Sequence, residues 1–114
     1  MSAVYVNNLV INVGSDFSQT FTLQGTDSNS AFDLTSYTAE AKMRKWSGSS
    51  SAIEFTIDIP LPKSSGKIVL ILDSNTTSTI KPGRYIYDVV ITSDMGIKNR
   101  VIEGMVLVRE GATY

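Results

Sequence analysis

The chain has 114 residues, with ten basic and eleven acidic side chains and a formal net charge of -1. This near-neutral charge gives no electrostatic reason to expect nucleic acid or an anionic membrane as a partner. The sequence contains no cysteine and no histidine, which excludes a disulfide, a Ser-His-Asp triad and a histidine-ligated metal. Its length predicts one domain, spanning residues 1–114.

Apolar and polar side chains alternate along most of the chain, a period of two that is typical of β-strands. The seven expected strands are, in chain order, Val4–Val13, Asp16–Gln24, Tyr37–Trp46, Ala52–Ile59, Lys67–Leu72, Arg84–Ser93 and Ile97–Glu110. Polar turns are expected at Gly25–Ser30 and Ser47–Ser51, and Asp94–Gly96 is expected to form a short hairpin loop.

One segment, Asp73–Ile80, favours a short helical turn near residues 73–80. Asp73 or Ser74 can cap this turn and Pro82-Gly83 ends it. Because the segment is rich in β-branched residues, we expect no more than about one turn of helix.

The segment Lys81–Asp88, with the sequence KPGRYIYD, indicates the fold class. Tyr85 and Tyr87 share one strand face directly after a Pro-Gly corner. This is typical of strand F in immunoglobulin-like domains, where a tyrosine-corner hydroxyl binds the upstream backbone. The sequence therefore predicts an all-β fold, an Ig-like antiparallel β-sandwich of about seven strands. Gly83, Tyr85 and Tyr87 are assigned to the fold and not to function.

Catalytic, cofactor-binding and metal-binding residues are not expected. Ser64-Ser65-Gly66-Lys67 contains the residue types of a Ser-Lys pair, but a turn entering a strand is the favoured interpretation. Asp27, Asn29 and Asp33 loosely resemble the start of a calcium loop, but they lack its glycine and closing glutamate. We therefore predict that the protein is not an enzyme and carries no cofactor.

An apolar strand face is the main indication of a partner surface. Ile86 and Val90 are expected to point outward from their strand, interrupted by Asp88, and Ile102 and Val106 are expected on the outward face of the next strand. Trp46 is added to this candidate interface; it follows a basic cluster interpreted as a solvated strand face. The N-terminal strand, Val4–Val13, is a candidate for strand addition to a partner.

Several segments together resemble small virion structural proteins of tailed bacteriophages of the cyanophage type, and the N-terminal domain of phage baseplate upper proteins. The segments that carry the resemblance are Gly14–Phe17, Phe21–Leu23, Phe32–Ala39, Ala41–Arg44, Gly66–Leu70, Pro82–Asp88 and Arg100–Val108. The resemblance implies an Ig-like sandwich built into a particle, with no catalytic residues. The coiled-coil or receptor-binding part of a baseplate protein is absent from this sequence.

We therefore expect a non-enzymatic structural component of a phage particle, in the tail, the baseplate or as head decoration. Its expected partners are other virion proteins and further copies of itself, and its expected location is the virion after assembly in the host cytoplasm. The alternative is a carbohydrate- or cell-surface-binding module, with Trp46, Tyr5 and Tyr114 stacking on sugar rings.

Overall fold

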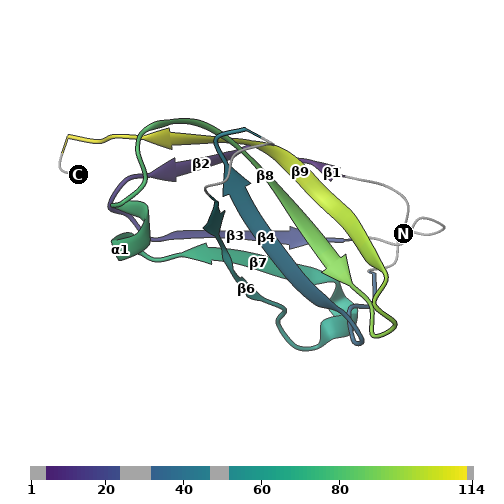
Figure 1. Cartoon of the computed structure of the whole chain (residues 1–114). Coiled ribbons are helices and arrows are strands. Elements are labelled where there is room, and N and C mark those ends of the chain that lie inside the picture. Colours follow the sequence, from purple (N-terminus) through teal and green to yellow (C-terminus); the bar gives the residue numbers. More distant parts are fainter. Residues whose placement is uncertain (1–4, 24–31, 47–51, 113–114) are drawn as a thin grey trace.

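The computed structural model describes residues 5–23, 32–46 and 52–112, and these form two facing β-sheets. The large sheet contains, in spatial order, β1 (Tyr5–Val6) and β2 (Leu9–Asn12), β9 (Lys98–Arg109), β8 (Gly83–Thr92), β4 (Thr38–Arg44) and β5 (Ile53–Glu54). The small sheet contains, in spatial order, β3 (Phe17–Thr22), β7 (Lys67–Leu72) and β6 (Thr56–Asp58). Strands β4, β8 and β9 run obliquely across β3 and β7 (Figure 1).

This architecture confirms the predicted Ig-like sandwich. Strands β3, β7 and β6 take the places of immunoglobulin strands B, E and D, while β4, β8 and β9 take those of C, F and G. Apolar side chains from the inner faces of both sheets form one buried cluster in the described part of the chain. Phe55 lies within it, with ring centroids 6.0 Å from Phe17 and 6.3 Å from Tyr87.

Two of the expected strands are each divided, so the described residues contain nine strands instead of seven. The first breaks at Asn7 and Asn8, between β1 and β2. The other breaks at Phe55, where the chain leaves β4 in the large sheet and joins β7 in the small one. The sequence pattern does not reveal this change of sheet, because apolar and polar residues continue to alternate across it. The Phe55 side chain points into the core at the break. The turns expected at Gly25–Ser30 and Ser47–Ser51 lie outside the described residues.

The N-terminal strands differ from the prediction in direction. Strands β1 and β2 pair with β9 in parallel, with Leu9 opposite Val106 and Ile11 opposite Val108. Leu9 and Ile11 are buried, so they close one side of the core. The predicted antiparallel arrangement holds for the other pairings of the described strands and does not extend to these two. This segment already pairs with β9 of its own chain, so donating it to a partner would require that pairing to break.

A close backbone approach marks the break between β1 and β2. A Cβ atom added to Gly104 of β9 would lie 2.1 Å from the carbonyl oxygen of Asn7. That carbonyl turns inward and accepts a hydrogen bond from the Tyr87 hydroxyl at 2.6 Å. The Asn8 side chain accepts instead from the backbone N–H of Met105, at 3.1 Å. The mid-strand glycine thus leaves room for a crossing strand, as a glycine in a strand often does.

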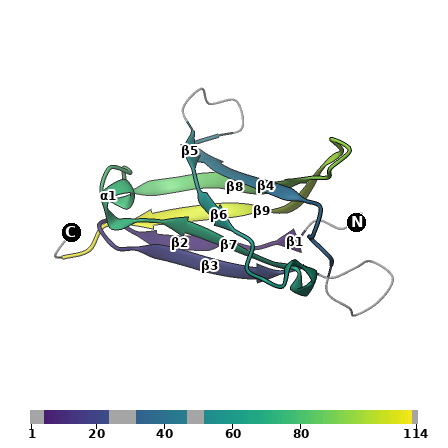
Figure 2. The same cartoon turned by 90° about the horizontal axis from the view of Figure 1, so that it is seen from below.

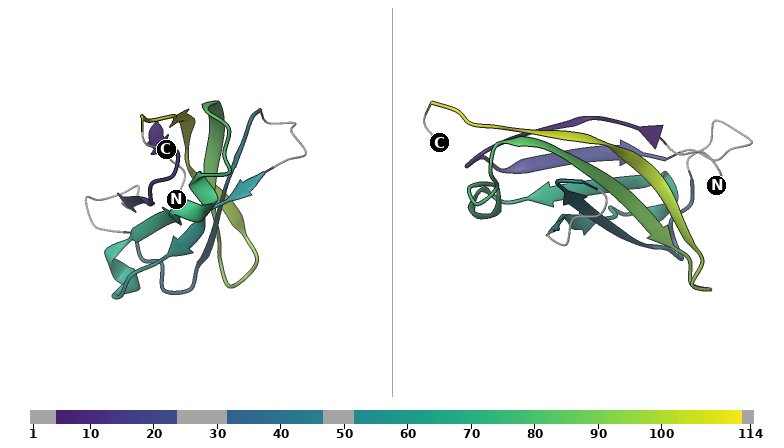
Figure 3. Two further views of the ribbon diagram at one scale, coloured as in Figure 1. Left: turned by 90° about the vertical axis from the view of Figure 1, so that its left-hand side faces the viewer. Right: turned by 45° about the horizontal axis from the view of Figure 1, so that its top comes forward.

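The predicted helical turn is present as α1 (Ser74–Thr77). Asp73 caps it by accepting from the backbone N–H of Thr76 at 2.8 Å, and hydrogen bonds from Thr76 hold the pKa of Asp73 below its usual value. Thr77 is fully buried; its hydroxyl donates to the Ser15 carbonyl and accepts from the N–H of Gly14. These bonds attach α1 to the turn between β2 and β3, at the end of the sandwich opposite the β8–β9 hairpin tip (Figures 2 and 3).

Candidate interaction face

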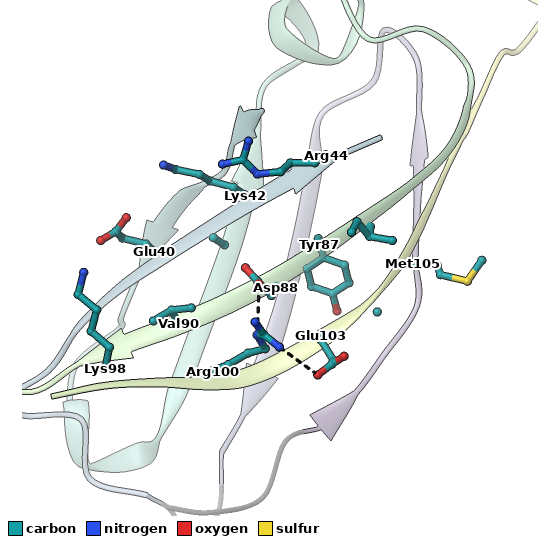
Figure 4. A pocket seen from close by; sticks show the side chains of 13 residues that line it. Glu40, Lys42, Arg44, Tyr87, Asp88, Val90, Lys98, Arg100, Glu103 and Met105 are labelled. Atoms are coloured by element: carbon teal, nitrogen blue, oxygen red, sulfur yellow. Dashed lines mark ion pairs between the residues drawn. The ribbon is translucent and has the colours of Figure 1, made fainter. Parts of the chain in front are cut away.

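The outer face of the large sheet is hollowed over β4, β8 and β9. The hollow has a volume of about 690 Å³ and is lined by charged and apolar side chains from all three strands (Figure 4). The charged side chains that line it are Glu40, Asp88, Glu103, Lys42, Arg44, Lys98 and Arg100. They share this face because alternate residues of neighbouring strands point the same way.

Asp88, which interrupts the apolar pattern of β8, belongs to a charged group on this face. Asp88 and Glu103 lie directly opposite each other on β8 and β9, an unfavourable pairing of like charges. The Arg100 side chain lies 3.3 Å from Asp88 and 3.9 Å from Glu103 and offsets their repulsion (Figure 4). All three side chains are about half exposed, so each ion pair contributes at most about 1 kcal/mol.

Next to this charged group lies a set of exposed apolar side chains that we call the outer apolar patch. Its members are Val6, Val10, Ile86, Met105 and Leu107, with exposed fractions from 37% for Ile86 to 77% for Val6. Val10 pairs with Leu107, and Ile86 pairs with Met105, so the patch continues from β2 across β9 to β8. A contiguous apolar surface of this kind is typical of an interaction site, whereas scattered exposed residues need no explanation.

The residues expected at the interface are divided between the two sides of the sheet. Ile86 and Val90 point outward as expected, and Trp46, just after β4, is 62% exposed. Ile102 and Val106 are fully buried in the core, so the expectation that they face outward is wrong. In the actual register they lie opposite Val89 and Tyr85, on the inner face of β8.

The sequence reasoning missed Met105 and Leu107 because residues 105–108 are all apolar, so the pattern there does not distinguish the two faces of β9. The register also shifts between Val89 and Val90, so Ile102 lies opposite Val89 while Arg100 lies opposite Val90. Val101, between them, has no partner across the ladder, and both Val101 and Ile102 are buried. Alternation cannot indicate such a bulge, because the extra residue changes which side the following residues occupy.

The tyrosine corner is present at the start of β8. The Tyr85 hydroxyl donates to the Lys81 carbonyl, four residues upstream, at 2.8 Å. The Lys45 ammonium lies 4.8 Å from the centroid of the Tyr85 ring, a cation–π contact. Gly83 opens the strand with a φ of 144°, a conformation that side chains rarely adopt.

Replacing Tyr85 with phenylalanine should lower the free energy of unfolding by about 1 kcal/mol, because the Lys81 carbonyl loses its donor. The bond lies at an exposed position where water can take the place of the hydroxyl, which keeps the cost low. Urea unfolding of both proteins at neutral pH measures the difference. An unchanged unfolding midpoint would show that this hydroxyl does not stabilise the corner.

The calcium-like segment and the Ser-Lys segment form local turn structure in the residues that the structure describes. Asp33 accepts hydrogen bonds from the hydroxyl and the backbone N–H of Thr35, which lower the pKa of its carboxyl group. Asp27 and Asn29 lie outside the described residues. Residues Lys63–Ser65 form a 3-10 turn that leads through Gly66 into β7, as the turn interpretation predicts. Among the residues that the structure describes, no three acidic side chains gather into a metal-binding group.

Of the three residues proposed for sugar stacking, the structure describes the side chain of Trp46 alone. The exposed Trp46 follows β4, while the Tyr5 side chain and Tyr114 are outside the part described.

None of the helices in the described ranges has the length and hydropathy needed to cross a membrane.

Three solved structures share this fold at low sequence identity. The N-terminal domain of phage TP901-1 ORF48 matches with a TM-score of 0.55 and 9% identity, over 90% of this chain and 85% of that one. The SrpA adhesin of Streptococcus sanguinis matches with 0.53 and 10%, over 97% and 57% of the two chains. A VGSC beta subunit matches with 0.51 and 10%, over 97% and 96%.

These likenesses establish the class of protein, an Ig-like β-sandwich whose fold is also found in a phage domain. Identities this low show the fold alone. No protein-family model matches the chain, and no curated protein matches it.

Proposed function

We propose that this chain is a non-enzymatic structural component of a phage particle, in its tail, baseplate or head. In this role it binds other virion proteins through the outer face of its large sheet. The outer apolar patch is the observation that carries the proposal, because it groups exposed apolar side chains from β1, β2, β9 and β8. The fold shared with the phage TP901-1 ORF48 domain supports the choice of particle.

The chemistry of the face fits a protein partner. An apolar centre beside a charged rim is the usual anatomy of a protein–protein interface. The patch supplies the apolar surface, and the Asp88–Arg100–Glu103 group, which includes both signs of charge, lies beside it. In a particle with many copies, a contact of modest affinity at each site is sufficient, because symmetry repeats it.

Incorporation into particles tests this proposal. Leu107→Lys places a charge in the patch at a position that is 42% exposed, so the variant should fold normally. We expect it to enter gradient-purified particles at least about tenfold less than the wild type, because a contact must then bury an unpaired charge. Immunoblots of purified particles, normalised to the major shell protein, measure the incorporated amount.

Met95→Lys is the matched control, since Met95 is 83% exposed at the tip of the β8–β9 hairpin, away from the patch. It should enter particles like the wild type. Equal incorporation of both variants would exclude the outer apolar patch as the contact surface. Absence of the wild-type chain from particles would overturn the proposal as a whole.

A further inference from the structure

The small sheet has an open edge at β3. In the described part of the chain, β3 pairs with β7 and with no other strand. Leu23 donates its N–H to Gly66, which precedes β7, so alternate residues Phe17, Gln19 and Phe21 direct their backbone groups toward β7. The N–H and C=O groups of Ser18, Thr20 and Thr22 therefore point away from the sheet.

Among the described residues, the surroundings of β3 leave this edge accessible. The side chains of Ser18, Thr20 and Thr22 are exposed, and β3 forms the lower margin of the sandwich in Figure 2. A hollow of about 250 Å³ lies beside the last residues of the strand. Its other side is formed by Val6, Asn7 and Ile102 of the large sheet.

The other sheet edges carry features that block pairing with another chain. Strand β5 has two residues and β6 has three, including the charged Asp58. The edge formed by β1 and β2 is broken at Asn7, where the carbonyl turns inward to Tyr87. By contrast, β3 has six consecutive residues (FSQTFT) without a charge, a proline or a bulge. Natural proteins usually protect such an edge with one of these devices or cover it.

The edge is also complementary to itself. If two copies of β3 pair in antiparallel order about a two-fold axis at Thr20, then Thr20 faces Thr20 of the second copy, and Ser18 faces Thr22. The outward N–H and C=O groups can then form about six hydrogen bonds, because each outward-directed pair exchanges two. The Gln19 side chain, whose Nε2 donates to the Thr20 carbonyl at 3.4 Å, must turn away from that carbonyl when the second copy pairs. On the outer face of the sheet these pairs are all Ser or Thr, which favour one another across strands, and no like charges meet.

We propose that β3 is a homodimer interface at which two copies of this chain join their small sheets into one continuous six-stranded sheet. The occupant of the edge is a second copy, and its register is centred on Thr20. This proposal uses neither the outer apolar patch nor the phage assignment, so its failure and the failure of the proposed function are distinguishable.

Disulfide trapping in the full chain tests both the pairing and its register. The chain has no cysteine, so each introduced thiol is unique. At the axis, opposite Cα atoms lie about 5.5 Å apart, within the range that a disulfide spans. Under mild oxidation, Thr20→Cys should form a covalent dimer at least about tenfold faster than Thr56→Cys, because pairing holds the two thiols together. Thr56 is exposed on β6, at the far edge of the same sheet, and gives the rate of random collision.

Ser18→Cys and Thr22→Cys define the register. Alone, Ser18→Cys should cross-link no faster than Thr56→Cys, because the two Ser18 positions are about 14 Å apart along the strand. Mixed with Thr22→Cys, it should form the mixed dimer as fast as Thr20→Cys does. Non-reducing gels, with mass spectrometry for the mixed species, measure the rates.

A Thr20→Cys rate equal to that of Thr56→Cys would overturn the dimer. A Ser18→Cys rate as high as that of Thr20→Cys would overturn the register. Sedimentation gives an independent readout: the wild type should change from monomer to dimer with rising concentration, and Thr20→Lys, which brings two ammonium groups together at the axis, should remain a monomer. A wild type that stays monomeric at millimolar concentration would also overturn the proposal.

Discussion

Replacing Gly104 with alanine should lower the free energy of unfolding by about 3 kcal/mol, at the upper end of the usual cost of overpacking. The added methyl group would lie 2.1 Å from the Asn7 carbonyl oxygen, and the nearby atoms belong mostly to backbone, which cannot rotate away. The chain must then either separate β1 from β9 or displace the carbonyl from the Tyr87 hydroxyl. Urea unfolding measures the loss, and amide exchange of Asn7 should accelerate because its N–H bonds to Glu103.

Gly96→Ala is the control for this substitution. Gly96 has a φ of 82° and no atom within 4 Å of an added Cβ, so its cost of about 1 kcal/mol is backbone strain alone. If Gly104→Ala costs no more than this control, β1 does not approach β9 as closely as described.

Replacing Tyr87 with phenylalanine should lower the free energy of unfolding by about 2 kcal/mol at neutral pH. The hydroxyl is the donor for the Asn7 carbonyl at 2.6 Å, and phenylalanine would leave that oxygen without this partner beside the core. The phenylalanine ring can still pack against Phe55, so the decrease in stability measures the contribution of the hydrogen bond. Urea unfolding of both proteins measures it. A loss below about 0.5 kcal/mol would show that this bond is not needed.

The contribution of Tyr87 should also depend on pH. Burial raises its pKa from 10.0 to about 12, so the fold favours the protonated phenol. Below pH 10 the phenol is protonated in the folded and unfolded chains alike, and its contribution is fully present. As the pH rises from 10 through 12, the unfolded chain releases this proton first, and the contribution is lost. The stability difference between wild type and Tyr87→Phe should therefore shrink across this window; a constant difference would contradict the assignment.

Much of the secondary structure could be predicted from local pattern. Each expected strand overlaps an observed one, and Lys67–Leu72 has the same bounds as β7. The helical turn capped by Asp73 and the corner bond of Tyr85 were also predictable, because their partners lie within a few residues along the chain. In both features a side chain forms a hydrogen bond with a backbone N–H or C=O group a few residues away, and backbone groups generally require such partners.

The candidate site was predicted only in part. Ile86 and Val90 could be placed on the outer face because polar and apolar residues alternate around them. Met105 and Leu107 could not, because residues 105–108 are apolar without alternation and β9 contains a bulge at Val101. A shift of one residue exchanges the two faces of a strand, so an error in register moves every later side chain to the wrong side.

The sequence by itself determined that this protein is a sandwich of short strands, because a period of two and the turn residues between strands are local properties. Only the tertiary structure decided which strands are neighbours. The parallel pairing of the N-terminal strands with β9, the change of sheet at Phe55 and the open edge of β3 all depend on contacts between distant segments. These contacts are decided by which apolar faces can be buried together, and alternation along a single strand does not contain that information.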